Sequence, residues 1–254
     1  MSRKICDCCG AYQRGRRFDN SKNGVTIREK GDELNVPIIQ PPPVSEQLRD
    51  EIHKAELIHD FITATVPDKF VGDTDKKILL AAIFSLTSEH HGAILHLLKS
   101  GRFDGSALAL VRPLIDSAYR AHWIYSCARP DIVARIKNGE DVYPGLINMA
   151  TEIEKKIDAD GMFASIAPYI NALHGYTHGG LEQLARRFDA AGTAVKPNYS
   201  DGEKLEAVKA TTAHFTALAI AWCQIVSTEP PEKEPLSKKI SDHYVAEYPM
   251  PAKA

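Results

Sequence analysis

The chain has few of the features that mark specialised classes of protein. It contains five cysteines in 254 residues, an odd and low number that argues against a disulfide framework and favours the reducing cytoplasm. No stretch of about 18 uncharged apolar residues occurs, so the sequence predicts no transmembrane helix. The start MSRKICDCCG has no apolar stretch behind its basic residues, so we expect no secretory signal. The formal net charge of −2 excludes a nucleic-acid clamp that is basic over its whole surface.

The chain also lacks the motifs of several large enzyme classes. None of the patterns GxxxxGK[ST], GxGxxG, GxSxG and HExxH is present, so nucleotide hydrolysis, hydride transfer and serine-hydrolase chemistry have no support. The cysteine group Cys6-Asp7-Cys8-Cys9 lacks the CxxC spacing of a zinc site and has no second ligand pair near it. We therefore expect no metal and no cofactor.

Three segments of different composition follow one another along the chain. Residues 1–43 are rich in Lys and Arg and end in Pro41-Pro42-Pro43, which indicates a basic, irregular or hairpin-like arm and a stiff spacer. The charge of this arm is expected to be solvated, with phosphate contact as the alternative. Gly24–Ile27 is the one alternating β-branched run. Residues 44–228 have helical periodicity and are expected to form one domain, and residues 229–254 a Pro-containing tail.

Within this domain the apolar side chains recur every three or four positions, as they do on one face of a helix. Ser45 is a candidate cap for the first helix and Asp73 or Thr74 for the second, which Gly101 is placed to end. The predicted helices cover residues 45–62, 73–100, 104–127, 131–138, 143–158, 163–174 and 200–227. The expected fold class is therefore a mainly α helical bundle.

The predicted helix at 104–127 is apolar on nearly every side, which is typical of a buried central helix. It nevertheless carries Arg112, Asp116 and Arg120, which are spaced four residues apart and so share one face. Buried charges need partners, and one aspartate cannot neutralise two arginines. We expect either Glu89 of the preceding helix or a bound anion to compensate the surplus charge, since arginines commonly hold phosphate or carboxylate.

Pro113 lies inside the same helix, next to Arg112. A proline has no backbone N–H and clashes with the carbonyl four residues earlier, so a kink is expected here. The alternative to an anion site is a purely structural network of Arg112, Asp116 and Arg120, locked by Glu89, that fixes the packing of the bundle.

A second polar group lies in the segment HGYTHGG at 174–180. Its three glycines favour a helix end, a turn and a new helix over one continuous helix, and this arrangement places His178 near a helix N-terminus, where anions bind. His174 and His178 are candidate acid–base groups because imidazole titrates near neutral pH, and Tyr176 is a candidate substrate contact. The alternatives are a hydrogen-bonded structural turn and a metal site. That metal site would use His90, His91, His174 and His178.

Parts of the chain resemble a group of uncharacterised bacterial all-helical proteins, in which an ALxRPLxE/DxxxR helix is followed by a His-Gly-Gly turn. The resemblance covers about residues 85–190. It rests on SEHHGAILHLL at 88–98, GSALALVRPLIDSAYRAHWIY at 105–125 and LHGYTHGGLEQLARR at 173–187. The group is similar in outline to the HEPN superfamily of helical bundles.

Many HEPN proteins are metal-independent RNases that act as dimers, and their marker is an arginine followed, after four to six residues, by a histidine. This chain departs from the marker, because nine residues separate Arg112 from His122 and one separates Arg120 from His122. The catalytic residues of that superfamily therefore do not transfer by motif. The resemblance implies a helical-bundle homodimer that binds RNA or another phosphate-bearing ligand in a defence or toxin system.

Two functions are consistent with these observations. The first is an RNA-cleaving or nucleotide-binding bundle, in which Arg112 and Arg120 hold a phosphate while His174 or His178 moves protons. The second is a non-catalytic dimeric interaction or regulatory protein whose polar residues form a structural network. A metal-dependent hydrolase is a third alternative. We expect a cytoplasmic protein that makes no contact with a membrane.

Overall fold

The computed structural model describes residues 17–21, 24–29, 32–37, 43–66, 73–157, 161–178, 180–187, 198–226 and 234–249. The chain divides into two compact units, Met1–Pro42 and Pro43–Ala254, so the division falls within the predicted proline spacer. The cysteine group at 6–9 lies outside the described residues.

The first unit contains a three-stranded antiparallel sheet in the order β1-β2-β3. The strands are β1 (Arg17–Ser21), β2 (Gly24–Glu29) and β3 (Asp32–Pro37). Ser21 pairs with Gly24 and Glu29 pairs with Asp32, so the strands form two consecutive hairpins with short connections. The alternating run at Gly24–Ile27 forms most of the central strand. The sequence predicts a hairpin-like arm, and the structure has one strand more than a single hairpin.

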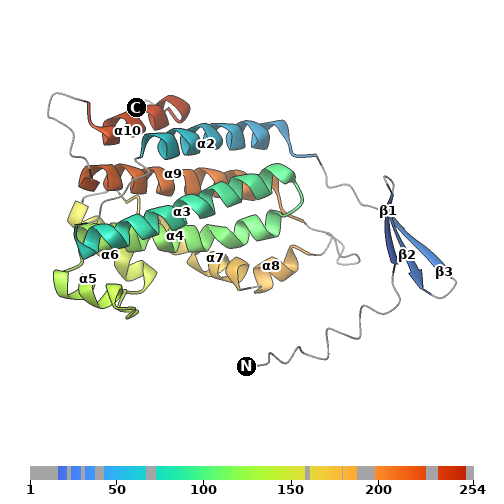
Figure 1. Cartoon of the computed structure of the whole chain (residues 1–254), viewed down its shortest axis with the longest axis horizontal. Coiled ribbons are helices and arrows are strands. Elements are labelled where there is room, and N and C mark those ends of the chain that lie inside the picture. The colour runs from blue at the N-terminus through green and yellow to red at the C-terminus, as the bar shows by residue number, and fades with distance from the viewer. Residues whose placement is uncertain are drawn as a thin grey trace. The chain divides into compact units, whose positions relative to one another are not determined.

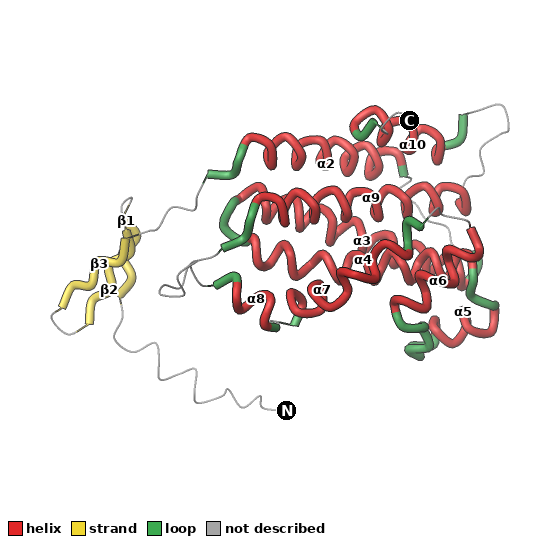
Figure 2. Tube along the Cα trace, turned by 180° about the vertical axis from the view of Figure 1, so that it is seen from behind, coloured by secondary structure: helices red, strands yellow, loops and turns green. Residues whose placement is uncertain are grey.

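The second unit is a helical bundle, which confirms the predicted mainly α fold class (Figures 1 and 2). Its long helices are α2 (Glu46–Thr65), α3 (Asp75–Ser100), α4 (Asp104–Ser126) and α9 (Asp201–Val226). The shorter elements are α5 (Pro130–Lys137), α6 (Leu146–Ile157), the 3-10 helix η1 (Ala164–Tyr169), α7 (Ile170–Thr177), α8 (Leu181–Ala185) and α10 (Leu236–Glu247). The long helices run alongside one another, and α7 packs against α4 (Figure 1).

The ends of the first two long helices follow from capping chemistry. The hydroxyl of Ser45 and that of Thr74 each accept a hydrogen bond from the backbone N–H three residues later, at 3.3 Å in both cases. Gly101 ends α3 in the left-handed conformation, with φ of 65°, which a side chain would strain. These contacts confirm the predicted caps and select Thr74 over Asp73.

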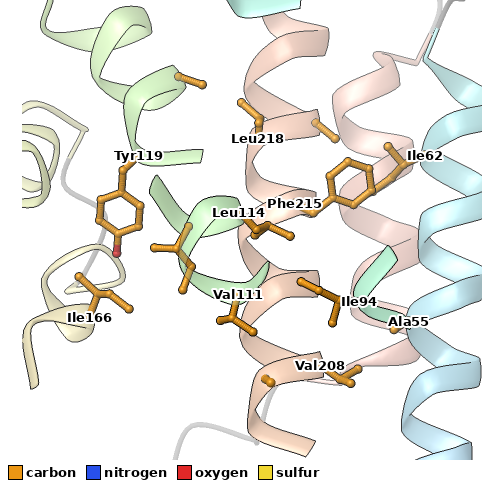
Figure 3. Packing of buried hydrophobic residues seen from close by; sticks show 14 of the residues in the cluster. Ala55, Ile62, Ile94, Val111, Leu114, Tyr119, Ile166, Val208, Phe215 and Leu218 are labelled. Atoms are coloured by element: carbon orange, nitrogen blue, oxygen red, sulfur yellow. The ribbon is translucent and has the colours of Figure 1, made fainter. Parts of the chain in front are cut away.

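The core lies around α9, which packs against α2, α3, α4 and α10. Figure 3 shows Phe215 and Leu218 of α9 among Ile94 of α3, Ile62 of α2 and Leu114 of α4. Each of these side chains is at most 2% exposed. Burial of such a side chain contributes about 1.5–3 kcal/mol, so this cluster is a main source of the stability that holds the helices in register.

α3 has an apolar face that the described residues of the bundle leave exposed. Among the described helices it alone is long and apolar enough to cross a membrane by length and composition, and 33% of its most apolar window is buried. Ile78 and Leu86 on this face are 41% and 44% exposed. Because α3 also packs against α2, α4, α5 and α9, it is an integral helix of the bundle.

The predicted tail at 229–254 contains a helix that packs in the bundle, so the expectation of a separate tail is corrected. α10 packs against α9 and α2, and Ile240 is 1% exposed. The rings of Tyr244 and Tyr248 stack with their centres 5.1 Å apart. Leu236 begins a four-residue repeat that continues through these side chains, a helical pattern in a segment otherwise marked by prolines.

Three histidines are buried in the core of the bundle as neutral side chains. Burial, aided by the nearby His59, lowers the pKa of His91 to about 3. Burial, aided by His214, lowers the pKa of His122 to about 3, and burial lowers the pKa of His214 to about 4. A protonated imidazole is disfavoured at these positions because it would be a charge without solvent.

The hydrogen bonds of His91 fix its tautomer. Its Nε2 lies 3.0 Å from the hydroxyl of Thr212, which itself donates to the carbonyl of Val208 at 2.7 Å. That hydroxyl therefore accepts from His91, so the proton of His91 is on Nε2. The Nδ1 of His91 then accepts from the Nδ1–H of His59, 3.1 Å away. With His91 neutral, as its burial dictates, this chain of bonds is complete and links α2, α3 and α9.

We expect the protein to lose stability on mild acidification. The unfolded chain protonates these histidines near the ordinary imidazole pKa of 6.5, whereas the folded chain holds them neutral down to about 4 or 3. Below pH 6.5 the unfolded state thus binds more protons, and stability falls by about 1.4 kcal/mol per pH unit for each histidine.

Urea unfolding at about pH 7.5 and about pH 5 measures this loss of stability. His214→Gln is expected to reduce the difference in unfolding free energy between the two pH values by roughly the contribution of one histidine. An unfolding free energy that is equal at the two pH values would contradict the burial of neutral imidazoles.

Candidate functional site

A cavity of about 330 Å³ lies between α3, α4 and α7. Pockets for small ligands begin at roughly 300 Å³, so this cavity has the size of a small-ligand site. It is lined by Leu86, His90, Arg112, Pro113, Asp116, Ser117, Arg120, His174, Thr177 and His178. The structure therefore brings the arginine face of α4 and the histidine turn after α7 to one place.

Two residues predicted for the site lie outside this cavity. Glu89 is exposed on α3, and the carboxylate that pairs with Arg112 is that of Asp116. The hydroxyl of Tyr176 donates to Oε1 of Glu203, 3.0 Å away, at the start of α9. Tyr176 thus ties the histidine turn to α9. Of the two groups expected to compensate the arginines, Glu89 or a bound anion, Glu89 is ruled out, because among the described residues it forms no salt bridge with either arginine.

Arg112 is held by two partners within the protein. Its Nε lies 3.0 Å from each carboxylate oxygen of Asp116, one helical turn later. Its Nη1 donates to the backbone carbonyl of Ile170 at 3.2 Å. The Arg112 side chain is 17% exposed. Asp116 therefore neutralises Arg112, and Arg112 in turn fastens α4 to the first residue of α7.

The charge of Arg120 is not compensated by any carboxylate of the described residues. Its guanidinium carbon lies 4.6 Å from the centre of the Tyr143 ring, and its Nε is buried with no hydrogen-bond partner. In the part of the chain that the structure describes, no carboxylate forms a salt bridge with Arg120. Two guanidinium groups against one carboxylate leave the cavity with one net positive charge when its histidines are neutral.

Pro113 helps to attach α7 to α4. Because a proline has no N–H, the carbonyl of Ala109 loses the donor that it would have in a regular helix. The hydroxyl of Thr177 lies 3.4 Å from this carbonyl and 2.9 Å from the carbonyl of Leu173. One hydroxyl hydrogen is shared between them. The proline thus makes a backbone acceptor available to α7 at the wall of the cavity.

His174 and His178 lie side by side at the end of α7. Their ring centres are 4.4 Å apart, and both side chains are exposed as well as lining the cavity. α7 ends at Thr177 and α8 begins at Leu181, so the predicted helix end, turn and new helix are confirmed. Two imidazoles at the wall of one cavity are the kind of groups that can donate and accept protons.

His90 is a cavity residue that the sequence pattern indicated only as a metal ligand. Partial burial lowers its pKa, an effect that Glu89 opposes. His90 follows Leu86 by four residues, so both lie on one face of α3. This spacing is the feature of the sequence that indicates a shared position at the cavity. His91, the next residue, faces the core instead. Within the described ranges, no group of three or more His, Cys, Asp or Glu side chains is placed to hold a metal ion.

We expect the Arg112 contacts to hold α7 in place. Arg112→Met keeps the apolar stem but leaves the carbonyl of Ile170 and the carboxylate of Asp116 without their donor, at a cost of about 1–3 kcal/mol. Hydrogen exchange should become faster in α7 and stay unchanged in α10.

The control is Arg129→Met. It breaks an ion pair between Arg129 and Asp131, whose side chains are 74% and 59% exposed, and should lower the stability little. Equal rates of hydrogen exchange in α7 of the two variants would contradict the role of Arg112.

Comparison with known proteins gives one match. No curated protein and no solved structure matches the chain. The model of one family, described as a family of unknown function (DUF6988), matches residues 84–250. This segment includes every residue that lines the cavity, and it agrees with the predicted resemblance to an uncharacterised family. Since the match covers more than half of the chain, the protein belongs to this family of unknown function, DUF6988.

Proposed function

We propose that the cavity binds a phosphate-bearing ligand, and that this ligand is RNA, which the protein cleaves without a metal ion. The observation that carries the proposal is the position of Arg120 in one cavity with His174 and His178, with no carboxylate partner among the described residues. An arginine stabilises negative charge that develops on phosphate oxygens, and imidazoles supply the acid and the base.

The proposed reaction uses the 2′-hydroxyl of the RNA as nucleophile. One imidazole takes its proton while the 2′-oxygen forms a bond to phosphorus. The bond from phosphorus to the 5′-oxygen breaks, and the second imidazole, in its protonated form, gives its proton to that oxygen. The products are a 2′,3′-cyclic phosphate and a free 5′-hydroxyl. His174 and His178 are the two imidazoles, and Arg120 holds the non-bridging oxygens.

The cavity favours this function over a closed structural network. In such a network each arginine would be paired, and no space would remain between α4 and α7. The Arg112–Asp116 pair has that structural character, but Arg120 and the two exposed histidines do not. The HEPN-like relationship, the defence or toxin role and the cytoplasmic location remain part of this proposal. They rest on the sequence resemblance and on the low cysteine content.

We expect the purified protein to cleave single-stranded RNA in the presence of EDTA. His174→Gln and His178→Gln should each lower the rate by about a hundred- to ten-thousandfold, which is the usual contribution of general acid–base catalysis. Arg120→Gln should lower it as well. The control is His96→Gln, which changes an exposed histidine of α3 outside the cavity. Residual cleavage that is the same in all of these preparations would identify a contaminating nuclease and refute the proposal.

The uncovered face of α3 favours a second candidate function, that of a dimeric interaction or regulatory protein. A second copy of the chain would cover Ile78 and Leu86 on this face, and since Leu86 also lines the cavity, the contact would reach the cavity's edge. Large apolar patches left exposed on a chain commonly mark such contacts. We propose a homodimer for either function, since a catalytic bundle with the same face would pair in the same way.

We expect Ile78→Lys to convert the dimer to a monomer, because it places a charge in the apolar contact. Ile147→Lys is the matched control, since Ile147 is 53% exposed on α6 and outside this face. Sedimentation equilibrium measures the change. An unaltered protein that sediments as a monomer, or a dimer that Ile78→Lys leaves intact, would contradict the proposed contact.

A further inference from the structure

The ring of Tyr143 lies against the guanidinium group of Arg120. Tyr143 lies in the connection between α5 and α6, and the guanidinium carbon of Arg120 is 4.6 Å from the centre of its ring. The ring of Trp123 meets it edge-on, with the centres 6.1 Å apart. The indole N–H of Trp123 donates to Glu152 of α6. The ring of Tyr143 is thus held against Trp123 of α4, which is itself bound to α6 through Glu152.

The contact with Tyr143 differs in kind from the salt bridge of Arg112. A carboxylate cancels the charge of an arginine and occupies its N–H donors, as Asp116 does for Arg112. The face of an aromatic ring attracts a guanidinium but leaves both its charge and its N–H donors in place. Burial is the main influence on the pKa of Tyr143 and raises it, so the phenol is neutral. Arg120 is therefore oriented by its neighbour and remains able to bind an anion.

The net charge of the cavity also favours phosphodiesters over phosphomonoesters. With neutral histidines the cavity carries one positive charge, that of Arg120. A phosphodiester carries one negative charge and two non-bridging oxygens, which a guanidinium can hold through two parallel hydrogen bonds. A phosphomonoester carries about 1.5–2 negative charges at neutral pH, and Asp116, whose side chain is 32% exposed, would repel the excess. The diester is the better match in charge and in geometry.

We propose that the ring of Tyr143 positions Arg120 as the phosphate receptor of the cavity, and that the ligand it receives is a phosphodiester. This inference rests on the proposed function and names the residue that orients its phosphate-binding arginine. Tyr143 is a positioning residue, since it acts through Arg120 and does not line the cavity itself. The ring is what matters, and the hydroxyl is not required.

Calorimetric titration of the full chain at about pH 8, above the usual titration range of imidazole, tests both parts. The probes are a deoxyribose dinucleoside monophosphate, which is a diester without the 2′-hydroxyl needed for cleavage, and the corresponding deoxynucleoside 3′-monophosphate. The variants are Tyr143→Phe, which keeps the ring, and Tyr143→Leu, which removes it. Tyr169→Leu, at a tyrosine that is 62% exposed, is the control, and thermal melting shows whether each variant is folded.

We expect the unaltered protein to bind the diester more tightly than the monoester. Tyr143→Phe and Tyr169→Leu should bind the diester as the unaltered protein does, and Tyr143→Leu about two- to thirtyfold more weakly. Two results overturn the inference while the proposed function stands: a folded Tyr143→Leu variant with unchanged affinity for the diester, or an equal loss of affinity in Tyr143→Phe. A preference for the monoester contradicts both the inference and the proposed cleavage of RNA. An unaltered protein that binds neither probe refutes the proposed function itself.

Discussion

The imbalance of two arginines and one aspartate on a single face of α4 is the constraint on which the cavity depends. Asp116 neutralises Arg112, whose Nη1 donates to the first residue of α7. Arg120 is left with a ring in place of a carboxylate. A second carboxylate on this face would have closed the network and removed the reason for an anion to bind. The same pairing that fixes α7 thus leaves the surplus charge beside His174 and His178.

Much of the bundle could be predicted because its signals are local. Ser45, Thr74 and Gly101 cap helices through contacts within a few residues, and apolar periodicity reports which face of each helix is buried. α10 was missed because the prolines around it masked a short apolar repeat. The third strand, β3, was missed because Asp32–Pro37 has no clear alternation of β-branched residues. In both cases packing or pairing with another element outweighs a weak local pattern.

The candidate site was predictable in part for the same reason. The spacing of Arg112, Asp116 and Arg120 defines a face, and the glycines after His174 define a turn, but neither pattern reveals how α3 is rotated. That rotation is set by the core, where His91 binds Thr212, and it directs His90 to the cavity and leaves Glu89 exposed. Tyr143 lies in a connection without periodicity, so only the folded chain reveals its contact with Arg120.

The central claim is that Arg120 supplies an uncompensated charge that draws a phosphate to the two exposed histidines. Titration with inorganic phosphate, followed by the NMR signals of the histidine side chains, tests it most directly. The account predicts saturable shifts of His174 and His178 in the unaltered protein, while the buried His214 stays unchanged. It predicts that Arg120→Gln abolishes these shifts. Identical shifts in the Arg120→Gln variant, or none in the unaltered protein, would contradict it.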